Sequence, residues 1–272
     1  MVPVLTTVFC VITLLVSLIL PILALVVYAL RHKKQGIWSA WGLGALGFVI
    51  PQMCIRSPIL ALLQKQNWFA LFAQNHLLAY TFCLALTAGL FELAGRFASA
   101  QLMRKNLTAA RGLAAGMGHG GIEAMAFIGT AYINNLVFII LLNSGGLDAL
   151  VSQTAAAGGD PAPLLYYRDT LCNTASILFL LAGLERLLTM ISHAAMSMLV
   201  CYGVAHKKAL PCALVCLAIH TCLDMPVCIP LLAGAAMSQA TAYCIVYLIL
   251  VIVAAGAVYL IRDLRRRWNP AP

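Results

Sequence analysis

Four helix-spaced sets of ionisable residues lie within apolar stretches of this sequence. Three pairs stand four residues apart and one pair seven apart: Glu92 and Arg96, His119 and Glu123, His220 and Asp224, and Arg186 and His193. Residues at these spacings project from the same side of a helix. Histidines can bind a divalent metal as neutral imidazoles, and a nearby carboxylate can take a proton from an activated water. The residue types therefore favour a metal site with a general base.

The depth of these groups makes them candidates for function. A charge at the centre of a bilayer costs at least about 2.5 kcal/mol, so such residues are rare unless they serve a purpose. Counted from the nearest basic cluster, Glu92, His119, Glu123, His193 and His220 lie 8 to 14 residues into their apolar runs. At 1.5 Å per residue this is about 12–21 Å. We expect four helices to bring these side chains into one layer near the bilayer middle.

The composition identifies the elements that must position them. Of the 272 residues, 63% are hydrophobic and 9% are charged, whereas a soluble domain carries about 25% charged residues. This excludes a soluble enzyme and predicts an all-α, polytopic membrane helix bundle in the cell membrane. We treat residues 1–272 as a single integral membrane domain with a motif-bearing core at 75–230. About seven spans are expected: 4–30, 36–55, 76–103, 112–142, 183–205, 209–231 and 239–261.

Basic residues predict the orientation of the spans. Twelve of the 17 Lys and Arg residues lie at span ends that share one side of the membrane, at 31–34, 104–111, 207–208 and 262–267. By the positive-inside rule, the N-terminus is outside and the C-terminus is cytoplasmic. The segment 163–182 is a short external helix, a re-entrant segment or an eighth span, and a single span before Lys207 fits the charge rule better. The net charge of +9 then reflects anchoring to the lipid bilayer, and no nucleic acid partner is expected.

Several groups also have simpler interpretations. Glu92 with Arg96 can be a salt bridge between helices, and Asp224 either joins a metal site or only orients His220. Glu185 with Arg186 lies near the outer edge and favours a structural role. Asn134 and Asn135 are expected to hydrogen-bond neighbouring helices. Cys212 and Cys216 have a metal-compatible spacing, but the ten cysteines contain no Cys-x-x-Cys pair and are best interpreted as small buried hydrophobes.

These residues lie in a pattern that resembles the YhfC-type family of intramembrane metalloproteases. That family is related to the CAAX prenyl protease and bacteriocin-processing group and to the PrsW proteases. The matching stretches are AGLFELAGR at 88–96, GMGHGGIEA at 116–124, Glu185–Arg186 with His193, and His220 with Asp224. The stretch at 116–124 is the most specific, and the resemblance covers roughly residues 75–230.

The resemblance implies a role for each matching position. Glu92 corresponds to the glutamate thought to activate water, and Arg96 to its partner arginine. His119 and His220 correspond to the histidines of later motifs, while His193 and Glu123 are polar positions particular to this family. Relatives usually carry paired glutamates in the first motif, whereas this chain has Leu93 in the second place. If that second glutamate were the base, this chain would be inactive or would rely on Glu123.

The leading prediction is a membrane metallopeptidase that cleaves a membrane-embedded or lipid-linked peptide or protein substrate. Zn²⁺, or another divalent metal, would be held by His119, His193, His220 and Asp224. Glu92, Arg96 and Glu123 would be catalytic. A proton-coupled transporter, a haem-binding electron carrier and a catalytically inactive scaffold remain alternatives, because buried carboxylates and histidines also serve proton relays and cofactor binding.

Overall fold

The protein is an all-helical, multi-pass membrane protein. Its structure is a computed structural model that describes residues 1–232 and 237–268, and these contain no β-strand. Seven helical stretches of the described chain are long and apolar enough to cross a membrane: Val4–Arg31, Ile37–Leu63, Leu77–Asn106, Ala109–Asn143, Ser176–Ala205, Ala209–Leu231 and Gln239–Trp268. The predicted fold class and number of spans are thus confirmed.

The segment 163–182 divides between two helices. Helix α10 (Ala162–Asn173) has 12 residues, and helix α11 (Ser176–Ala205) begins three residues after it ends. A helix of 12 residues is too short for a hydrocarbon core of about 30 Å. One span therefore precedes Lys207, and it starts seven residues earlier than the expected residue 183.

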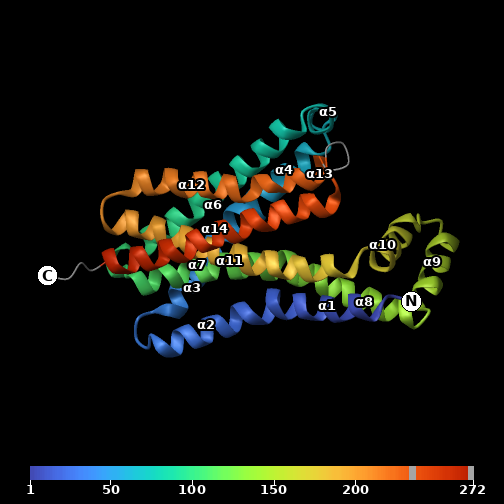
Figure 1. Ribbon diagram of the computed structural model, residues 1–272, viewed down its shortest axis with the longest axis horizontal. Helices are drawn as coiled ribbons and strands as arrows, with labels where there is room; N and C mark the ends of the chain where they lie inside the picture. The colour runs from blue at the N-terminus through green and yellow to red at the C-terminus, as the bar shows by residue number, and fades with distance from the viewer. Residues whose placement is uncertain (233–236, 269–272) are drawn as a thin grey trace. The chain divides into compact units, whose positions relative to one another are not determined.

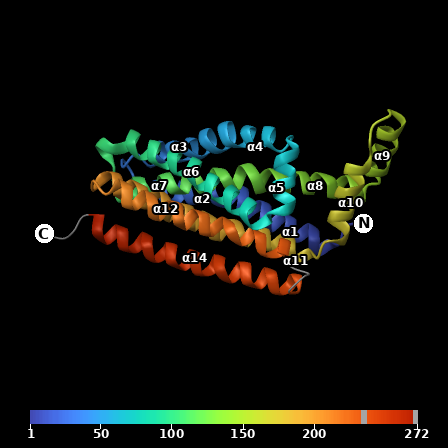
Figure 2. The ribbon, with the colours of Figure 1, turned by 90° about the horizontal axis from the view of Figure 1, so that it is seen from above.

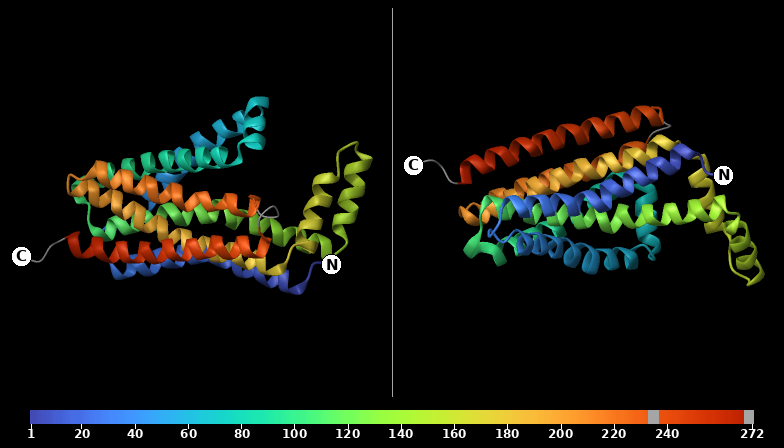
Figure 3. Two further views of the ribbon diagram at one scale, coloured as in Figure 1. Left: turned by 45° about the horizontal axis from the view of Figure 1, so that its top comes forward. Right: turned by 90° about the horizontal axis from the view of Figure 1, so that it is seen from below.

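The chain forms two compact units. Unit 1 contains Met1–Pro21 and Ala124–Leu187, and unit 2 contains Ile22–Glu123 and Leu188–Pro272. The helical segments of unit 1 are α1 (Val4–Leu14), the π-helical η1 (Leu15–Ile19) and η4 (Met125–Gly129), α8 (Thr130–Asn143), α9 (Gly146–Ala156), α10 and the first part of α11. Helices α9 and α10 form a short pair within this unit (Figure 3).

Polar side chains link the helices of unit 1. The hydroxyl groups of Thr13 and Tyr132 both donate to the carbonyl oxygen of Phe179, at 2.6 and 3.0 Å. Tyr167 on α10 donates to the side-chain oxygen of Asn135 on α8. This contact confirms for Asn135 the expected hydrogen bond to a neighbouring helix.

Unit 2 is a bundle whose long helices run beside one another (Figure 1). Its elements are α2 (Leu20–Arg31, from Ile22), α3 (Ile37–Phe48), the π-helical η2 (Val49–Arg56), α4 (Ser57–Leu63), α5 (Asn67–Asn75), α6 (Leu77–Met103), η3 (Arg104–Asn106), α7 (Ala109–Ala124, to Glu123), the second part of α11, α12 (Ala209–Asp224), η5 (Met225–Val227), α13 (Cys228–Leu232) and α14 (Gln239–Trp268). Helix α6 packs against both α3 and α12. Figure 2 shows α14 running alongside α11 and α12.

Small residues let α3 and α6 approach closely. A Cβ atom added to Gly95 would lie 1.7 Å from the carbonyl oxygen of Gly47, so any larger residue would push the helices apart. Ser99, one turn further along α6, donates to the carbonyl oxygen of Leu43 at 2.7 Å. Close backbone approach of this kind is typical of helix packing in membranes.

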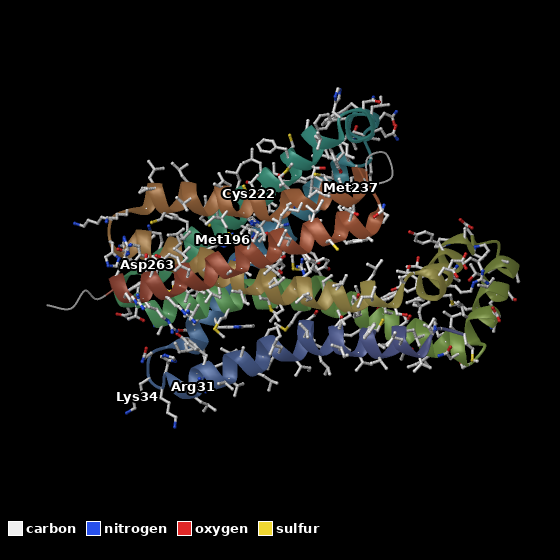
Figure 4. The ribbon with its side chains drawn as sticks, viewed as in Figure 1. Arg31, Lys34, Met196, Cys222, Met237 and Asp263 are labelled. Carbon is white, nitrogen blue, oxygen red and sulfur yellow. The ribbon has the colours of Figure 1, made fainter. Side chains whose placement is uncertain are left out.

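Two of the basic clusters, at 31–34 and 262–267, lie at one end of unit 2. Arg31 and Lys34 lie at the same end of this unit as Asp263, and Met237 lies at the opposite end (Figure 4). The positive-inside rule predicts that the end with Arg31 faces the cytoplasm.

Candidate metal centre

The structure places seven predicted site residues on four helices of unit 2. They are Glu92 and Arg96 on α6, His119 and Glu123 on α7, His193 on α11, and His220 and Asp224 on α12. Glu92, Arg96 and the three histidines are each at most 3% exposed. A group of ionisable side chains this deeply buried is stable only if its members satisfy one another.

The carboxylate of Glu92 is the meeting point of the group. Its Oε2 atom lies 2.9 Å from His119 Nε2 and 3.1 Å from Arg96 Nη2. The same oxygen lies 3.4 Å from His220 Nε2 and 3.7 Å from His193 Nδ1. Four nitrogens from four helices therefore surround one carboxylate oxygen.

His193 connects Glu123 to this centre. Arg96 Nη2 donates to His193 Nδ1 at 2.7 Å. Because arginine can only donate, Nδ1 is the acceptor, and the ring proton of neutral His193 is on Nε2. That nitrogen lies 3.1 Å from Glu123 Oε2. Glu123 thus supports the side of the imidazole that faces away from Glu92.

The glycine-rich stretch of α7 makes room for His193. A Cβ atom added to Gly120 would lie 2.9 Å from His193 Cβ and 3.2 Å from Met190 Cα. The rings of His119 and His193 stack at 5.4 Å, and Phe48 contacts His119 edge-on at 5.3 Å. The position of Gly120 and these ring contacts fix the imidazoles relative to one another.

Asp224 lies on the Glu92 side of His220. Its Oδ2 atom is 3.8 Å from His220 Nε2, the same nitrogen that faces Glu92. The other nitrogen, His220 Nδ1, is buried and has no hydrogen-bond partner among the described residues. An aspartate that only oriented the ring would contact the nitrogen opposite the site. This geometry favours Asp224 as part of the site.

Residues next to the motifs lie elsewhere. Leu93 packs against the hydrophobic core of unit 2, while its neighbour Glu92 faces the histidines. Cys212 and Cys216 belong to the same core, where both are free thiols. Arg186, which shares a helix with His193, donates to the adjacent Glu185 in unit 1.

Sequence reasoning missed one buried ionisable residue near the site. Arg56 follows directly after the predicted span end at residue 55, but the helix continues to Leu63 and Arg56 is only 8% exposed. Gln52, four residues earlier, is 7% exposed. The spacing of these two polar residues at the end of an apolar run was the available signal.

The donor set fits a divalent metal. One atom each from Glu92, His119 and His193 lie within 4.8 Å of one another. Tetrahedral zinc with ligand bonds of 2.0–2.1 Å places its ligands about 3.4 Å apart, close to the distances around Glu92 Oε2. His119 Nδ1 and both ring nitrogens of His220 also lack hydrogen bonds within the described chain. The residues could therefore hold a metal after small shifts of their side chains.

An apolar cleft of about 400 Å³ adjoins the helices that carry His193 and His220. Ser192 and Met196 line it from α11, Ile219 and Cys222 from α12, and Gly256 from α14. Figure 4 shows Met196 and Cys222 in this part of unit 2. A volume of this size is sufficient for a small apolar ligand.

The fold and the site together define a multi-pass membrane protein with a carboxylate–histidine cluster buried within its helices. Comparison with known proteins gives the family. The model of the YhfC intramembrane metalloprotease family matches residues 16–253, and the chain belongs to this family. It is also 30% identical over 196 residues to the "Uncharacterized membrane protein YhfC" of Bacillus subtilis (strain 168), covering 72% of this chain and 74% of that protein. No solved structure matches the chain.

Proposed function

We propose that this protein is an intramembrane metallopeptidase that hydrolyses membrane-embedded or lipid-linked peptides. The observation that carries the proposal is the contact of Glu92 with three imidazoles and an arginine in a water-poor interior. Electrostatic interactions are stronger in such an environment than in water, so fixed charges act strongly on a reacting group.

The metal, zinc in this proposal, would be held by His119, His193 and His220, with Asp224 reaching the same side. Glu92, whose oxygen lies among the candidate ligand atoms, would stay free of the metal to act as the base. A divalent ion of this kind supplies an activated water at neutral pH and polarises a peptide carbonyl. Because Arg96 donates to His193 Nδ1, it must release that nitrogen for His193 to bind the ion.

Glu92 is proposed as the general base. Its Oε2 atom accepts the proton of the attacking water, and the same carboxyl group can then protonate the leaving amine. Arg96 holds Glu92 in place through their 3.1 Å contact. Glu123 Oε2 lies 3.1 Å from His193 Nε2, where its negative charge favours the proposed orientation of the imidazole.

The depth of the site determines the class of substrate. The candidate residues lie within membrane-spanning helices, so a substrate reaches them only if it enters the bilayer. The apolar cleft between α11, α12 and α14 is lined by Ser192 and Ile219, the neighbours in sequence of His193 and His220, and we propose that a substrate enters from this side. An apolar peptide segment or a lipid anchor matches its lining.

Metal analysis of the purified protein tests the site. We expect roughly one zinc ion per wild-type chain, and a loss of metal in His119→Ala and in His220→Ala. His76→Ala is the matched control, because His76 is exposed and opens α6 far from the cluster. Equal, negligible metal in all four proteins would refute the metal centre.

Activity is tested with a base variant. Glu92→Gln is expected to keep the protein folded and to abolish cleavage of an apolar peptide in proteoliposomes. Cleavage at the wild-type rate would exclude Glu92 as the base.

One observation bears on the inactive-scaffold alternative. The departure from the family pattern at Leu93 would matter if position 93 faced the cluster, but Leu93 packs in the apolar core and Glu92 faces the histidines. This supports a base at position 92. A transporter instead predicts ion flux in liposomes that Glu123→Gln abolishes, with no peptide cleavage.

A further inference from the structure

Arg56 is a buried cation held in a fixed orientation near the cluster. Its Nη2 atom donates to the carbonyl oxygen of Leu84 at 2.7 Å, and both Nε and Nη2 lie 3.4 Å from the hydroxyl oxygen of Thr87. These contacts use one edge of the guanidinium group. The third nitrogen, Nη1, makes no hydrogen bond to any described residue.

The charge of Arg56 has no direct counter-ion in the described part of the chain, where it forms no salt bridge. It interacts electrostatically, over a longer distance, with Glu92 and Asp224. Removing a charge from water without a close partner costs several kcal/mol. A buried arginine of this kind favours the binding of an anion.

Gln52 adds a second polar group on the same π-helical segment, η2. Its side chain is 7% exposed, and its Oε1 atom has no hydrogen-bond partner within the described residues. Phe48, one turn earlier, contacts His119. The stretch from Phe48 to Arg56 therefore runs from the level of the cluster toward the outer half of α6. Short π-helical insertions are frequent at functional sites.

The depth of Arg56 limits the source of the anion. Its helix ends at Leu63, seven residues further on, so Arg56 lies about 10 Å inside the end of the span. A carboxylate carried by a peptide chain that enters the bilayer can reach this depth.

We infer that Arg56 is a substrate-anchoring residue, whose Nη1 group binds a carboxylate of the peptide on the outer side of the Glu92 cluster. The carboxylate is either the C-terminus of the peptide or an acidic side chain. This inference deepens the proposed peptidase function and rests on it for the identity of the ligand as a substrate. Arginine suits the role because it stays charged when buried and donates several hydrogen bonds from a fixed plane.

Peptide binding to the metal-loaded protein in lipid nanodiscs tests the inference. The probe is a fluorescein-labelled apolar peptide of leucine and alanine in three forms: with a free C-terminal carboxylate, with a C-terminal amide, and with that amide and an aspartate near the end. Fluorescence anisotropy gives the affinity. Mass spectrometry of the recovered peptide reports cleavage separately, so failure of the peptidase proposal and failure of the anchoring role are distinguishable.

The wild type is expected to bind at least one carboxylate form about tenfold more tightly than the neutral amide, as for a charged hydrogen bond. Arg56→Gln should remove this preference while its affinity for the neutral amide and its metal content stay at wild-type values, and Arg56→Lys should keep part of the preference.

Arg104→Gln is the matched control, because Arg104 is exposed. A preference for the free C-terminus or for the aspartate identifies the source of the carboxylate. Equal binding of all three peptides by the wild type, or an unchanged preference in Arg56→Gln, would overturn the inference.

Discussion

Arg96 is the residue whose replacement most directly tests the electrostatics of the centre. Its Nη2 atom contacts Glu92 Oε2 at 3.1 Å and His193 Nδ1 at 2.7 Å, and its side chain is 1% exposed. Arg96→Gln removes the cation that lies closest to Glu92. Removing one partner of a buried ion pair typically costs about 3–5 kcal/mol, because the remaining charge is left in a low dielectric.

This cost corresponds to a measurable fall in thermal stability. At roughly 2–4 °C per kcal/mol, we expect Arg96→Gln to lower the apparent unfolding temperature by about 6–20 °C. The measurement is intrinsic tryptophan fluorescence during heating, in detergent with a chelator present. Arg104→Gln should change it little, since substitutions of exposed residues usually alter stability by no more than about 0.5 kcal/mol.

Added zinc should reverse part of the loss. In the variant, His193 Nδ1 no longer accepts from arginine, and a bound cation can replace the missing charge beside Glu92. A ligand that binds only the folded state stabilises it by an amount that rises with the logarithm of its affinity, so zinc should raise the unfolding temperature more in Arg96→Gln than in the wild type.

A double variant identifies the source of the effect. Adding Glu92→Gln to Arg96→Gln removes the unpaired charge. The double variant should therefore lose about 0.5–3 kcal/mol less unfolding free energy than the two single variants lose together. Additive losses, or a loss in Arg96→Gln no larger than in the Arg104 control, would show that Glu92 and Arg96 do not form a coupled buried pair.

Three further predictions concern residues around the centre. Gly120→Ala should destabilise the protein by about 1–3 kcal/mol and weaken zinc binding, because its new Cβ would displace His193. Gly256→Ala should be tolerated, since nothing lies within 4 Å of its Cβ position; equal effects in chemical denaturation would contradict this packing. Glu123→Gln should lower zinc affinity about 10-fold to 100-fold in a chelator competition, as expected when a residue that supports a ligand is weakened, and an unchanged affinity would contradict this role. Leu93→Glu should lower thermal stability without raising peptidase activity, because position 93 faces the apolar core; a gain in cleavage rate would instead place the base there.

The spans could be predicted because the bilayer fixes the length of each apolar run and requires helices to satisfy the backbone. The main difference is the start of α11. The predicted span, 183–205, already contained Glu185 and Arg186, and the helix continues seven residues further toward the N-terminus, to Ser176, through the apolar residues 177–182. Hydropathy favours an apolar run of this kind in a helix but does not mark the residue at which the helix begins.

The spacing within a helix predicted some contacts of the site but could not assign partners between helices. Glu92 and Arg96, four residues apart, do pair. His119 lies against Glu92, and Glu123 against His193, each on a different helix from its partner. These pairings depend on how α6, α7 and α11 rotate against one another, and close approach at residues such as Gly120 determines that rotation.

The positions of Arg56 and Glu92 give a prediction for the cleavage product. Arg56 is held at the level of Thr87 on α6, and Glu92 lies five residues further along that helix. The axial separation is therefore about 7.5 Å, and an extended peptide advances about 3.3–3.6 Å per residue. If Arg56 anchors a carboxylate and Glu92 acts on the scissile bond, the bond cleaved should lie about two residues from that carboxylate. Mass spectrometry of the products measures this length directly. In the wild type, fragments of about two residues should be released from a peptide anchored by its C-terminus. Cleavage sites with no fixed distance from the carboxylate would refute the combined arrangement, even if metal binding and peptidase activity were both established.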